Sequence, residues 1–313
     1  MAAQNFSEDE QHNTIGDLSC WPDFTSGLPN GQLTFLSVLN SFLSITAFLG
    51  NALILVTLYK ESSLHPPSKL LLRSLATADL CVGLITEPLD VISWITITNG
   101  HRNIYRYTTL LGCTTSNVFC GVSVLTLTAI SVDRLLALLL GLGYRQVVTL
   151  KRTYVIVITL WVLPAFLSAM WFWNPSIYVL GRIIGIPLCL IISISSYTKI
   201  FLTLRHHQNQ VQDHVQQPNQ TNQLNIARYK KAVSTAVWLQ LTLVACYLPY
   251  GVATTLVTSG GRFSSVTNAW NYAVTLVYFN SSLNPILYCW KIEEVRQAVK
   301  NTIRQVLYHC FSN

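Results

Sequence analysis

Charged residues are scarce in this chain. Only 11% of its 313 residues are Asp, Glu, Lys or Arg, whereas soluble globular chains average about 25%. Hydrophobic residues make up 51%, and the mean hydropathy is +0.40. This composition excludes an ordinary cytosolic enzyme, a disordered chain and a coiled coil. An integral membrane protein is the class that fits it.

A recognisable signal peptide is also missing. Residues 1–32 are polar and contain no basic segment followed by an apolar stretch. We therefore expect residues 1–32 to form an N-terminal tail. The first hydrophobic segment would then direct its own insertion into the membrane.

What the chain does contain is a series of long hydrophobic segments. A bilayer core of about 30 Å requires about 20 mostly apolar residues per helix, because lipid offers the backbone no hydrogen-bonding partner. Seven segments meet this requirement: Leu33–Leu58, Leu70–Ile97, Leu110–Leu140, Val155–Trp173, Ile177–Leu204, Ala232–Val257 and Val266–Trp290. We predict an all-α membrane protein, with a seven-transmembrane helix bundle over residues 33–290.

The basic residues predict the orientation of the bundle. Lys and Arg concentrate in the cytoplasmic loops of membrane proteins. Of the 20 Lys and Arg, all but Arg102, Arg106, Arg182 and Arg262 fall on the side of the C-terminus. We therefore expect an extracellular N-terminus and a cytoplasmic C-terminus. Because these charges lie at helix ends and not in a stripe between aromatic residues, we expect contact with anionic membrane lipid and no nucleic-acid partner.

A short amphipathic segment follows the last span, within residues 291–313. Its apolar residues recur at steps of three and four: Ile292, Val295, Val299, Ile303 and Val306. This pattern predicts a helix that lies on the cytoplasmic surface of the membrane. Cys310 beyond it is a candidate for palmitoylation, and an unmodified thiol fits the sequence equally well.

Asp79 lies in the middle of the second span. A carboxylate inside a membrane helix is energetically costly, so we take Asp79 as a candidate functional residue. Other polar residues lie at similar depth: Asn51, Ser123, Asn280, Ser281 and Asn284. One carboxylate with hydroxyl and amide oxygens suits a small hard cation. Spacing alone favours a simpler interpretation, a hydrogen-bonded network that packs the helices.

Features of a conformational switch lie nearer the cytoplasmic side. Asp133 and Arg134 close the third span, where an Arg beside an Asp can exchange partners as helices move, although an Arg at this depth also commonly snorkels to the interface. Pro249 and Pro285 interrupt the sixth and seventh spans. Each removes a backbone hydrogen bond and kinks its helix. Two kinks near a buried polar cluster indicate a switch.

These residues together resemble the rhodopsin-like (class A) G-protein-coupled receptors over residues 33–308. The motifs are Gly50-Asn51, Leu75–Asp79, Asp133-Arg134-Leu135, Trp161, Tyr197, Cys246–Pro249 and Asn284–Tyr288. Each motif alone is weak evidence for the family. All of them together, in the right order and each on its own helix, are specific for it. The resemblance implies a plasma-membrane receptor that binds an extracellular ligand and activates a heterotrimeric G protein, with arrestin as a further partner.

The resemblance also implies roles for individual residues. The residues that match the family's sodium pocket are Asp79, Ser123, Asn280, Ser281 and Asn284. It therefore favours an allosteric sodium ion, with no other metal or cofactor, over simple packing. Arg134 matches the arginine that engages the G protein. Tyr197 and Tyr288 match the tyrosines that move to meet it, and Tyr247 stands where the family usually has a toggle Trp.

Departures from the family pattern narrow the subgroup. Most members have a Cys near the outer end of the third helix, where Thr109 stands, bonded to the second extracellular loop. Here only Asn174-Pro175-Ser176 joins the fourth and fifth spans, and Cys189 replaces the usual Pro of the fifth. These features are similar to the melanocortin branch and its cannabinoid, lysophospholipid and adenosine-like relatives. We expect a relative of the melanocortin receptors and not a member, because the third extracellular loop (Ser259–Ser265) lacks their Cys and the third helix lacks their outer acidic residues.

The resemblance restricts the ligand. Ser116 stands where amine receptors have an Asp, and Tyr278 stands where opsins have the Lys that binds retinal. We therefore expect neither a conventional amine nor retinal. A peptide, a lipid and a nucleoside all stay open.

Two outer-half residues of opposite charge are further candidates for the ligand pocket. Asp90 suits a basic group, unless it snorkels to the outer interface or pairs with Arg102 or Arg106. Arg182 suits an anionic head group, or lies in a loop if the fifth helix begins later. Glu87 is expected to face away from the bundle.

The sequence also makes predictions for several positions outside the spans. Asn5-Phe6-Ser7 is an acceptor for N-glycosylation in the extracellular tail, whereas Asn219-Gln220-Thr221 falls in a cytoplasmic loop. Cys20 and Cys113 are the cysteines expected outside, either bridged or as two thiols. Tyr229 stands near the place of an acidic residue that restrains the family's arginine, which predicts raised basal activity.

Other functions fit less well. A transporter that uses Asp79 as an ion relay would require internal repeats with broken helices in matching halves, which the sequence lacks. A decoy receptor would bind ligand without coupling. The intact Arg134 and Asn284–Tyr288 argue against it, whereas Leu135 and Tyr247 leave it open. An enzyme would require a nucleophile, a base and an oxyanion site, and no such set is recognisable.

Overall fold

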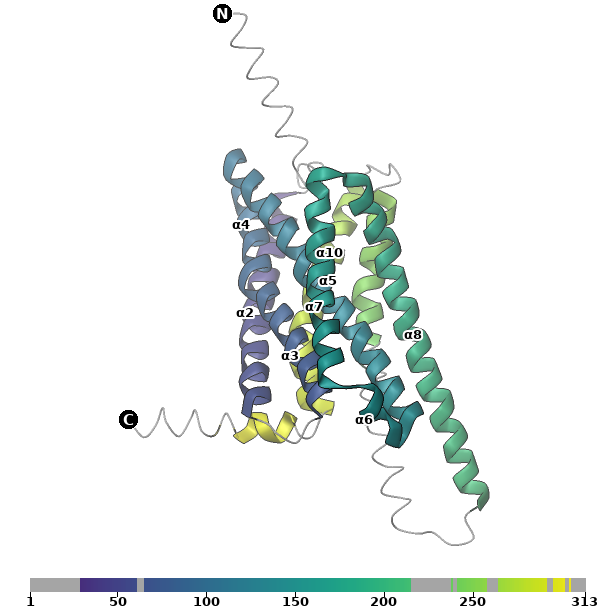
Figure 1. Cartoon of the computed structure of the whole chain (residues 1–313). Helices are drawn as coiled ribbons and strands as arrows, with labels where there is room; N and C mark the ends of the chain where they lie inside the picture. The colour runs from purple at the N-terminus through teal and green to yellow at the C-terminus, as the bar shows by residue number, and fades with distance from the viewer. Residues whose placement is uncertain are drawn as a thin grey trace, which may run out of the picture.

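The computed structural model describes residues 29–60, 65–214, 238, 241–257, 264–291, 295–301 and 304. The elements in order are α2 (Asn30–Lys60), α3 (Pro66–Cys81), the π-helix η1 (Val82–Thr86), α4 (Glu87–Thr98), α5 (Arg102–Leu140), the 3₁₀ helix η2 (Gly141–Gly143), α6 (Tyr144–Val147), α7 (Leu150–Trp173), α8 (Pro175–His214), a helix at Leu241–Val257 and α10 (Ser264–Lys291). The long helices run side by side as one bundle (Figure 1).

The helices account for the seven predicted spans. In the described part, five are long and apolar enough to cross a membrane: Asn30–Lys60, Pro66–Thr98, Arg102–Val147, Leu150–Trp173 and Pro175–Thr203. Leu241–Val257 is apolar but shorter there, and α10 occupies the seventh span. Several helices extend beyond the predicted spans. For example, α5 begins at Arg102, whereas the predicted span begins at Leu110. Hydropathy marks only the part inside lipid, whereas backbone hydrogen bonding continues beyond it.

The second span is not the continuous α-helix that its hydropathy suggests. It consists of α3, η1 and α4, and the wide π turn accommodates an extra residue. Gly83 within η1 lies against α2, because a Cβ at this position would be 2.8 Å from Phe48 N and 2.9 Å from Ser44 O. Ser44 Oγ donates to the carbonyl of Gly83 at 2.7 Å. The π turn also rotates the later side chains of the span around the helix axis.

Polar and small residues face the interior of the bundle together with apolar ones, while many large apolar residues face outward. The buried residues of α7 are Thr153, Pro164 and Ser168, whereas Val162 and Phe166 are exposed. Helices in lipid gain nothing from hiding apolar surface and associate through close packing and hydrogen bonds instead. The distribution is that of a lipid-embedded bundle.

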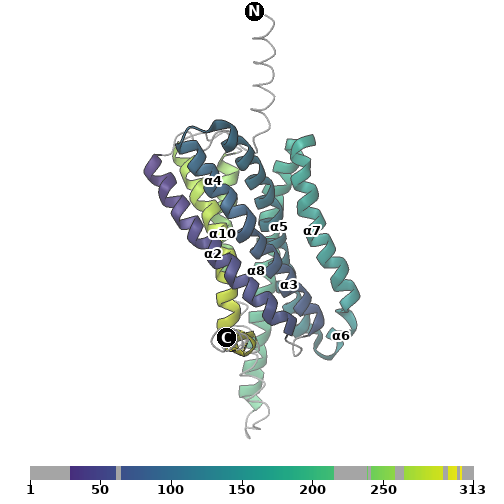
Figure 2. The same cartoon turned by 90° about the vertical axis from the view of Figure 1, so that its left-hand side faces the viewer.

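The two ends of the bundle are built differently. At the upper end in Figure 1, Asn174 alone separates α7 from α8, as the short predicted junction requires. The rings of Trp171 and Tyr178 meet edge to face there, 5.1 Å apart. At the opposite end lie α6 and the segment after α10 (Figures 1 and 2). Residues 295–301 of that segment are helical, with Val295 and Val299 buried, which agrees with the predicted amphipathic helix.

Candidate functional site

Asp79 is the centre of a buried polar cluster. Its Oδ1 accepts hydrogen bonds from Ser123 Oγ at 2.7 Å and from Ser281 Oγ at 2.9 Å. Its Oδ2 accepts one from Asn284 Nδ2 at 2.6 Å. The side chain of Asp79 is fully buried. Three helices, α3, α5 and α10, therefore meet at one carboxylate.

Two side-chain amides of α10, one of which is bonded to this carboxylate, have polar atoms without a hydrogen-bond partner among the described residues. Both polar side-chain atoms of Asn280 and the Oδ1 of Asn284 are buried without a hydrogen-bond partner among the described residues. Buried polar atoms are normally paired, so such orphans call for a ligand or water. Carboxylate, hydroxyl and amide oxygens are the ligands of a small hard cation. The structure brings together Asp79, Ser123, Ser281 and Asn284, four of the five residues predicted for the sodium pocket, and their oxygens suit that ion.

Gly50 and Asn51 attach α2 to this region. Asn51 Nδ2 donates to the carbonyls of Ala47 at 2.8 Å and of Ser281 at 3.0 Å. A Cβ at Gly50 would lie 3.0 Å from Pro285 Cγ. Glycine therefore lets α2 approach α10 at the point where proline interrupts it.

The second polar cluster lies at the α6 end of α5. Arg134 Nη2 donates to Asp133 Oδ2 at 2.8 Å and to Ser68 Oγ at 2.6 Å. Tyr144 OH donates to Asp133 Oδ1 at 2.6 Å, and Ser68 Oγ donates to Oδ2 at 3.0 Å. Asp133 is 5% exposed, whereas Arg134 is 46% exposed. The guanidinium is therefore held through Nη2, while nearly half of the arginine side chain is exposed.

Sequence reasoning missed Ser68 and Tyr144. Tyr144 lies on α6 and Ser68 on α3, so their contacts with Asp133 depend on the packing of three helices. No motif or periodicity marks either residue in the sequence.

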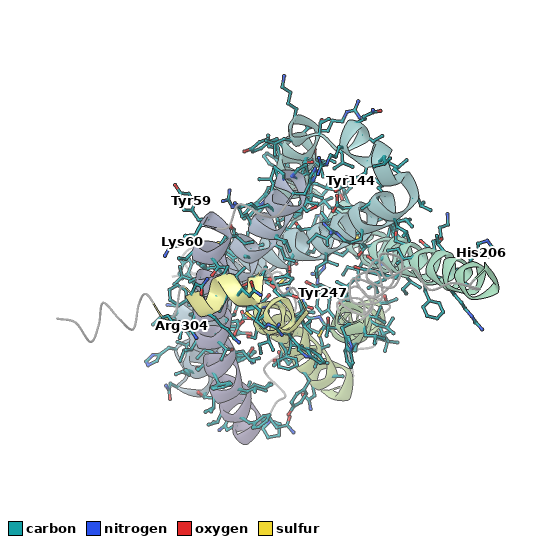
Figure 3. All side chains as sticks on the ribbon, turned by 90° about the horizontal axis from the view of Figure 1, so that it is seen from below. Tyr59, Lys60, Tyr144, His206, Tyr247 and Arg304 are labelled. Carbon is teal, nitrogen blue, oxygen red and sulfur yellow. The ribbon has the colours of Figure 1, made fainter. Side chains whose placement is uncertain are left out.

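The tyrosines predicted for activation lie at separate places. Tyr247 OH donates to the carbonyl of Cys120 at 3.2 Å, which joins the helix of Pro249 to α5. Tyr288 is buried, and its hydroxyl has no hydrogen-bond partner among the described residues. Tyr197 is buried on α8 and packs near Leu135. Seen from the α6 end, Tyr247 lies nearer the centre of the bundle than Tyr144 (Figure 3).

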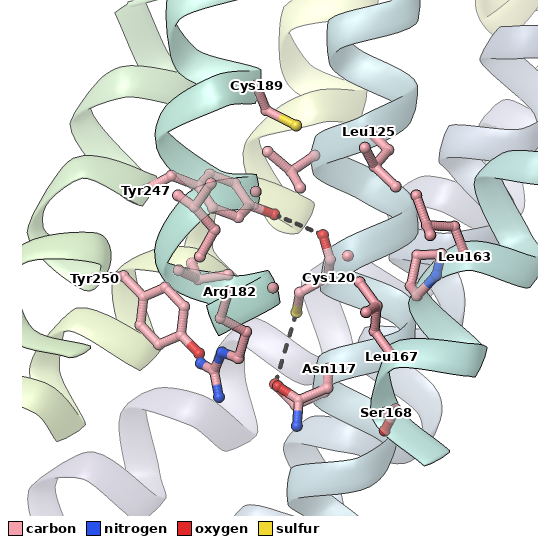
Figure 4. Close-up of a pocket in the computed structure, with 18 of the residues that line it drawn as sticks. Asn117, Cys120, Leu125, Leu163, Leu167, Ser168, Arg182, Cys189, Tyr247 and Tyr250 are labelled. Atoms are coloured by element: carbon pink, nitrogen blue, oxygen red, sulfur yellow. Dashed lines mark hydrogen bonds between the residues drawn. The ribbon is translucent and has the colours of Figure 1, made fainter. Parts of the chain in front are cut away.

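A cavity opens among α5, α7, α8, the helix Leu241–Val257 and α10 (Figure 4). The volume of this cavity is about 140 Å³. Its walls are mostly apolar, with residues such as Val124, Leu167 and Ile186. A neighbouring cavity of about 70 Å³, lined in part by α4, shares six lining residues with the first: Ser116, Asn117, Arg182, Tyr250, Val274 and Tyr278. The two cavities are adjoining parts of one site.

Arg182 lies within α8 and not in a loop, so the alternative that the helix begins later is wrong. Its guanidinium lies over the rings of Tyr178 and Tyr250, 5.3 Å and 5.1 Å from their centroids. Arg182 Nη1 also donates to Tyr178 OH. These contacts orient the arginine at a wall common to both cavities.

Asp90 faces the second cavity from α4. Its Oδ2 accepts a hydrogen bond from Tyr278 OH at 2.6 Å, and that hydroxyl is 3.2 Å from Ser116 Oγ. The alternative pairing of Asp90 with Arg102 or Arg106 is wrong in the described structure, which shows no such contact.

The expectation that Glu87 faces away from the bundle is also wrong. Its side chain is completely buried, and neither carboxylate oxygen has a hydrogen-bond partner among the described residues. The prediction assumed a regular α-helix through the second span, and the π turn directly before Glu87 changes the direction of its side chain.

Several predicted positions lie outside the described residues: Asn5, Cys20, Asn219, Tyr229 and Cys310. The expectations for glycosylation, palmitoylation, a disulfide and basal activity at these positions stay predictions.

Comparison with known proteins gives one family. The model of the family described as 7 transmembrane receptor (rhodopsin family) matches residues 50–175 and 164–288. The chain is 23% identical to the adenosine receptor A3 of Bos taurus, over 85% of this chain and 88% of that protein. It is 24% identical to the trace amine-associated receptor 8c of Rattus norvegicus, over 86% of each. It is 26% identical to the melanocortin receptor 5 of Bos taurus, over 83% of this chain and 82% of that protein.

Proposed function

The chain belongs to the rhodopsin family of seven-transmembrane receptors, and on that premise we propose how it transmits a signal. An extracellular ligand binds in the two adjoining cavities, and a heterotrimeric G protein binds at the end that carries Arg134. In the plasma membrane the N-terminus is then extracellular and the basic C-terminal end is cytoplasmic, in contact with anionic lipid. Arrestin would compete for the same cytoplasmic end.

The observation that carries the proposal is the position of three sites along α5. Ser116 lines the cavities, Ser123 contacts Asp79 and Arg134 closes the cytoplasmic end. Ser116 and Arg134 are about 27 Å apart along the helix at 1.5 Å per residue. One rigid element therefore passes from the ligand site through the polar core to the coupling site.

The mechanism is a shift between two arrangements of the helices. A ligand changes this equilibrium only by binding one arrangement more tightly than the other. Tyr247 lines the cavity and contacts the Cys120 carbonyl, and the neighbouring Pro249 weakens its helix, so a ligand that moves Tyr247 can pivot the cytoplasmic half. Such movement would release Arg134 from Asp133 and Ser68 to engage the G protein. Tyr197, Tyr288 and Pro285 would complete the rearrangement.

We further propose that an allosteric sodium ion stabilises the resting arrangement. The residues that would hold it are Asp79, Ser123, Asn280, Ser281 and Asn284. The ion would balance the charge of the buried carboxylate. The partnerless oxygens of Asn280 and Asn284 support this assignment. When the helices rearrange, the hydroxyls and amides would turn to other partners.

The ligand class is only partly restricted by the relatives. They include an adenosine receptor, which makes a nucleoside a candidate ligand, and a trace amine-associated receptor. Ser116 provides no charge for an amine at the conventional position on α5.

The test is second-messenger output in cells without added ligand. Wild type is compared with Arg134→Ala at matched surface level, and with Arg102→Ala, which removes an exposed arginine from the other end of α5. We expect output above that of untransfected cells in wild type and Arg102→Ala, lost in Arg134→Ala. Equal output from wild type and Arg134→Ala would contradict the proposal.

A further inference from the structure

One carboxylate faces the second of the two adjoining cavities. Asp90 of α4 is the acidic residue among the described residues that line either cavity. Its Oδ2 accepts a hydrogen bond from Tyr278 OH at 2.6 Å, whereas its Oδ1 accepts none from a described residue. The buried polar atoms that lack a partner do not include this Oδ1, so it is not sealed inside the protein. One oxygen of the carboxylate is therefore open to a hydrogen-bond donor in the cavity.

Asp90 has no ion-pair partner in the described part of the chain. The ion pair found there joins Arg134 to Asp133, at the other end of the bundle. Arg182 lines the same cavity but belongs to α8, where its guanidinium lies over the rings of Tyr178 and Tyr250. A carboxylate in a poorly solvated site favours any cation that reaches it.

The neighbouring helices leave room for this carboxylate and hold it in place. A Cβ at Gly112 of α5 would lie 2.5 Å from Asp90 Oδ1, so a larger residue there would displace the carboxylate. The Tyr278 hydroxyl that donates to Oδ2 is also 3.2 Å from Ser116 Oγ. Asp90 is thus positioned against α5 and bonded to α10, and a group that binds it meets three helices.

The rest of the second cavity suits an organic cation. Its lining includes five aromatic side chains: Trp94, Tyr105, Tyr250, Trp270 and Tyr278. The faces of such rings attract an ammonium group that has left water. A metal ion such as Ca²⁺ or Mg²⁺ instead requires several oxygen ligands. One carboxylate among aromatic rings therefore favours an organic ammonium over a metal ion.

The first cavity accepts an apolar body but offers nothing to a second ammonium. Aliphatic and aromatic side chains such as Val124, Leu167 and Ile186 make up most of its lining. No acidic residue is among the described residues that line it, and the charged one is Arg182. A positive charge placed there would lack a counterion. The two cavities together fit a molecule with one positive end and an apolar remainder.

We propose that the ligand is a small amine with one protonated nitrogen at the end of a compact apolar or aromatic body. This inference rests on the proposed function only in that the cavities are the ligand site. The ammonium donates to Asp90 Oδ1, and the apolar body extends into the first cavity. The anchor of the amine is therefore on α4 and not at Ser116 of α5.

The test measures binding without any G protein, so a failure of coupling leaves its result unchanged. The purified full chain in lipid nanodiscs is heated with each of three probes that share a phenylethyl body. One is 2-phenylethylamine, with a single ammonium. The second is 2-phenylethanol, with a neutral hydroxyl in its place. The third is 4-(2-aminoethyl)benzylamine, with a second ammonium at the far end.

We expect 2-phenylethylamine to raise the unfolding temperature at about 10-fold lower concentration than either other probe. The alcohol loses a charge-assisted hydrogen bond, and the diamine places a charge in an apolar cavity.

Variants assign the contact to Asp90. Asp90→Asn should abolish the preference for 2-phenylethylamine over 2-phenylethanol. Gly112→Ala, which displaces the carboxylate and removes no charge, should reduce the same preference. Asp213→Asn makes the same chemical change near the C-terminal end of α8, outside the lining of both cavities, and should keep the preference. The unfolding temperature of each variant without probe reports whether it folds.

Three outcomes would overturn the proposal. Equal stabilisation by 2-phenylethanol or by the diamine would mean that a single ammonium is not what the site selects. A full preference for the amine in a folded Asp90→Asn variant would remove Asp90 from the site. No stabilisation by 2-phenylethylamine at millimolar concentration would contradict the ligand class.

Discussion

Asp79 shows how single residues determine the properties of the core. Its carboxylate accepts three hydrogen bonds from neutral donors, two from α10 and one from α5. A buried carboxylate with neutral partners favours any cation that reaches it. The unpaired Oδ1 of Asn284, whose Nδ2 is bonded to this carboxylate, strengthens that preference.

The sodium assignment predicts a salt-specific stability. At equal ionic strength, sodium chloride should raise the unfolding temperature of the purified chain above its value in choline chloride. Sodium at about tenfold above its Kd would contribute about 1.4 kcal/mol. Asp79→Asn should abolish the difference. Ser168→Ala, which alters a buried serine bonded to the Thr114 carbonyl, should keep it. A sodium effect that survives Asp79→Asn would disprove the site.

Tyr144 provides a second prediction at this scale. Tyr144→Phe removes the hydroxyl that donates to Asp133 Oδ1, and so loosens the group that holds Arg134. If this costs the resting arrangement about 1 kcal/mol, basal signalling should rise about fivefold. The measurement is ligand-free second-messenger output at matched surface level. Tyr154→Phe on an exposed tyrosine is the control, and equal output from Tyr144→Phe and wild type would count against the restraint.

The sequence identified some of these residues but not their partners. Asp79 and Arg134 stand out because charges near membrane helices are rare and costly. Ser68 and Tyr144 do not stand out, because serine and tyrosine are ordinary in and near membrane helices. Their importance comes from the helix packing that brings both to Asp133.

At the scale of elements, hydropathy located the spans but not the irregular turn within the second. The need for apolar length is imposed by lipid and is visible in the sequence. The π turn Val82–Thr86 depends on the contact of Gly83 with α2 and leaves no such pattern. The error at Glu87 followed from this turn, because Glu87 comes directly after it and its side chain points into the bundle.

The close contact at Gly83 predicts a large effect of one methyl group. In Gly83→Ala, the Cβ would meet backbone atoms of α2 at 2.8 Å and 2.9 Å. We expect a loss of about 1–3 kcal/mol, because backbone atoms cannot move aside as a side chain can. Gly185→Ala is the matched control in α8, where a Cβ would meet nothing within 4 Å. Thermal unfolding should show Gly83→Ala less stable and Gly185→Ala unchanged or more stable; equal stability of the two would contradict the account.

At the scale of the whole molecule, the distribution of Lys and Arg predicts which end faces the cytoplasm. The structure places α6 and residues 295–301 at one end and the α7–α8 junction at the other (Figure 1). The cavities and the Arg134 cluster then face opposite sides of the membrane. A receptor requires this separation.

Two acceptor sequences for N-glycosylation test that orientation. Asn5 and Asn219 both begin an acceptor sequence, but only Asn5 is expected on the extracellular side. Glycosidase treatment should reduce the apparent mass of the wild-type chain and of Asn219→Gln, and should have no effect on Asn5→Gln. A mass shift that disappears in Asn219→Gln and persists in Asn5→Gln would mean that the membrane orientation is inverted.

A receptor that couples through Arg134 catalyses nucleotide exchange on its G protein. The most direct measurement is the rate of GDP release from purified heterotrimeric G proteins of each class, with the purified chain in nanodiscs and no cellular components. We expect wild type to accelerate release from at least one class and Arg134→Ala to leave the rate at that of empty nanodiscs. Equal acceleration by wild type and a folded Arg134→Ala variant, or no acceleration with any class, would contradict the account.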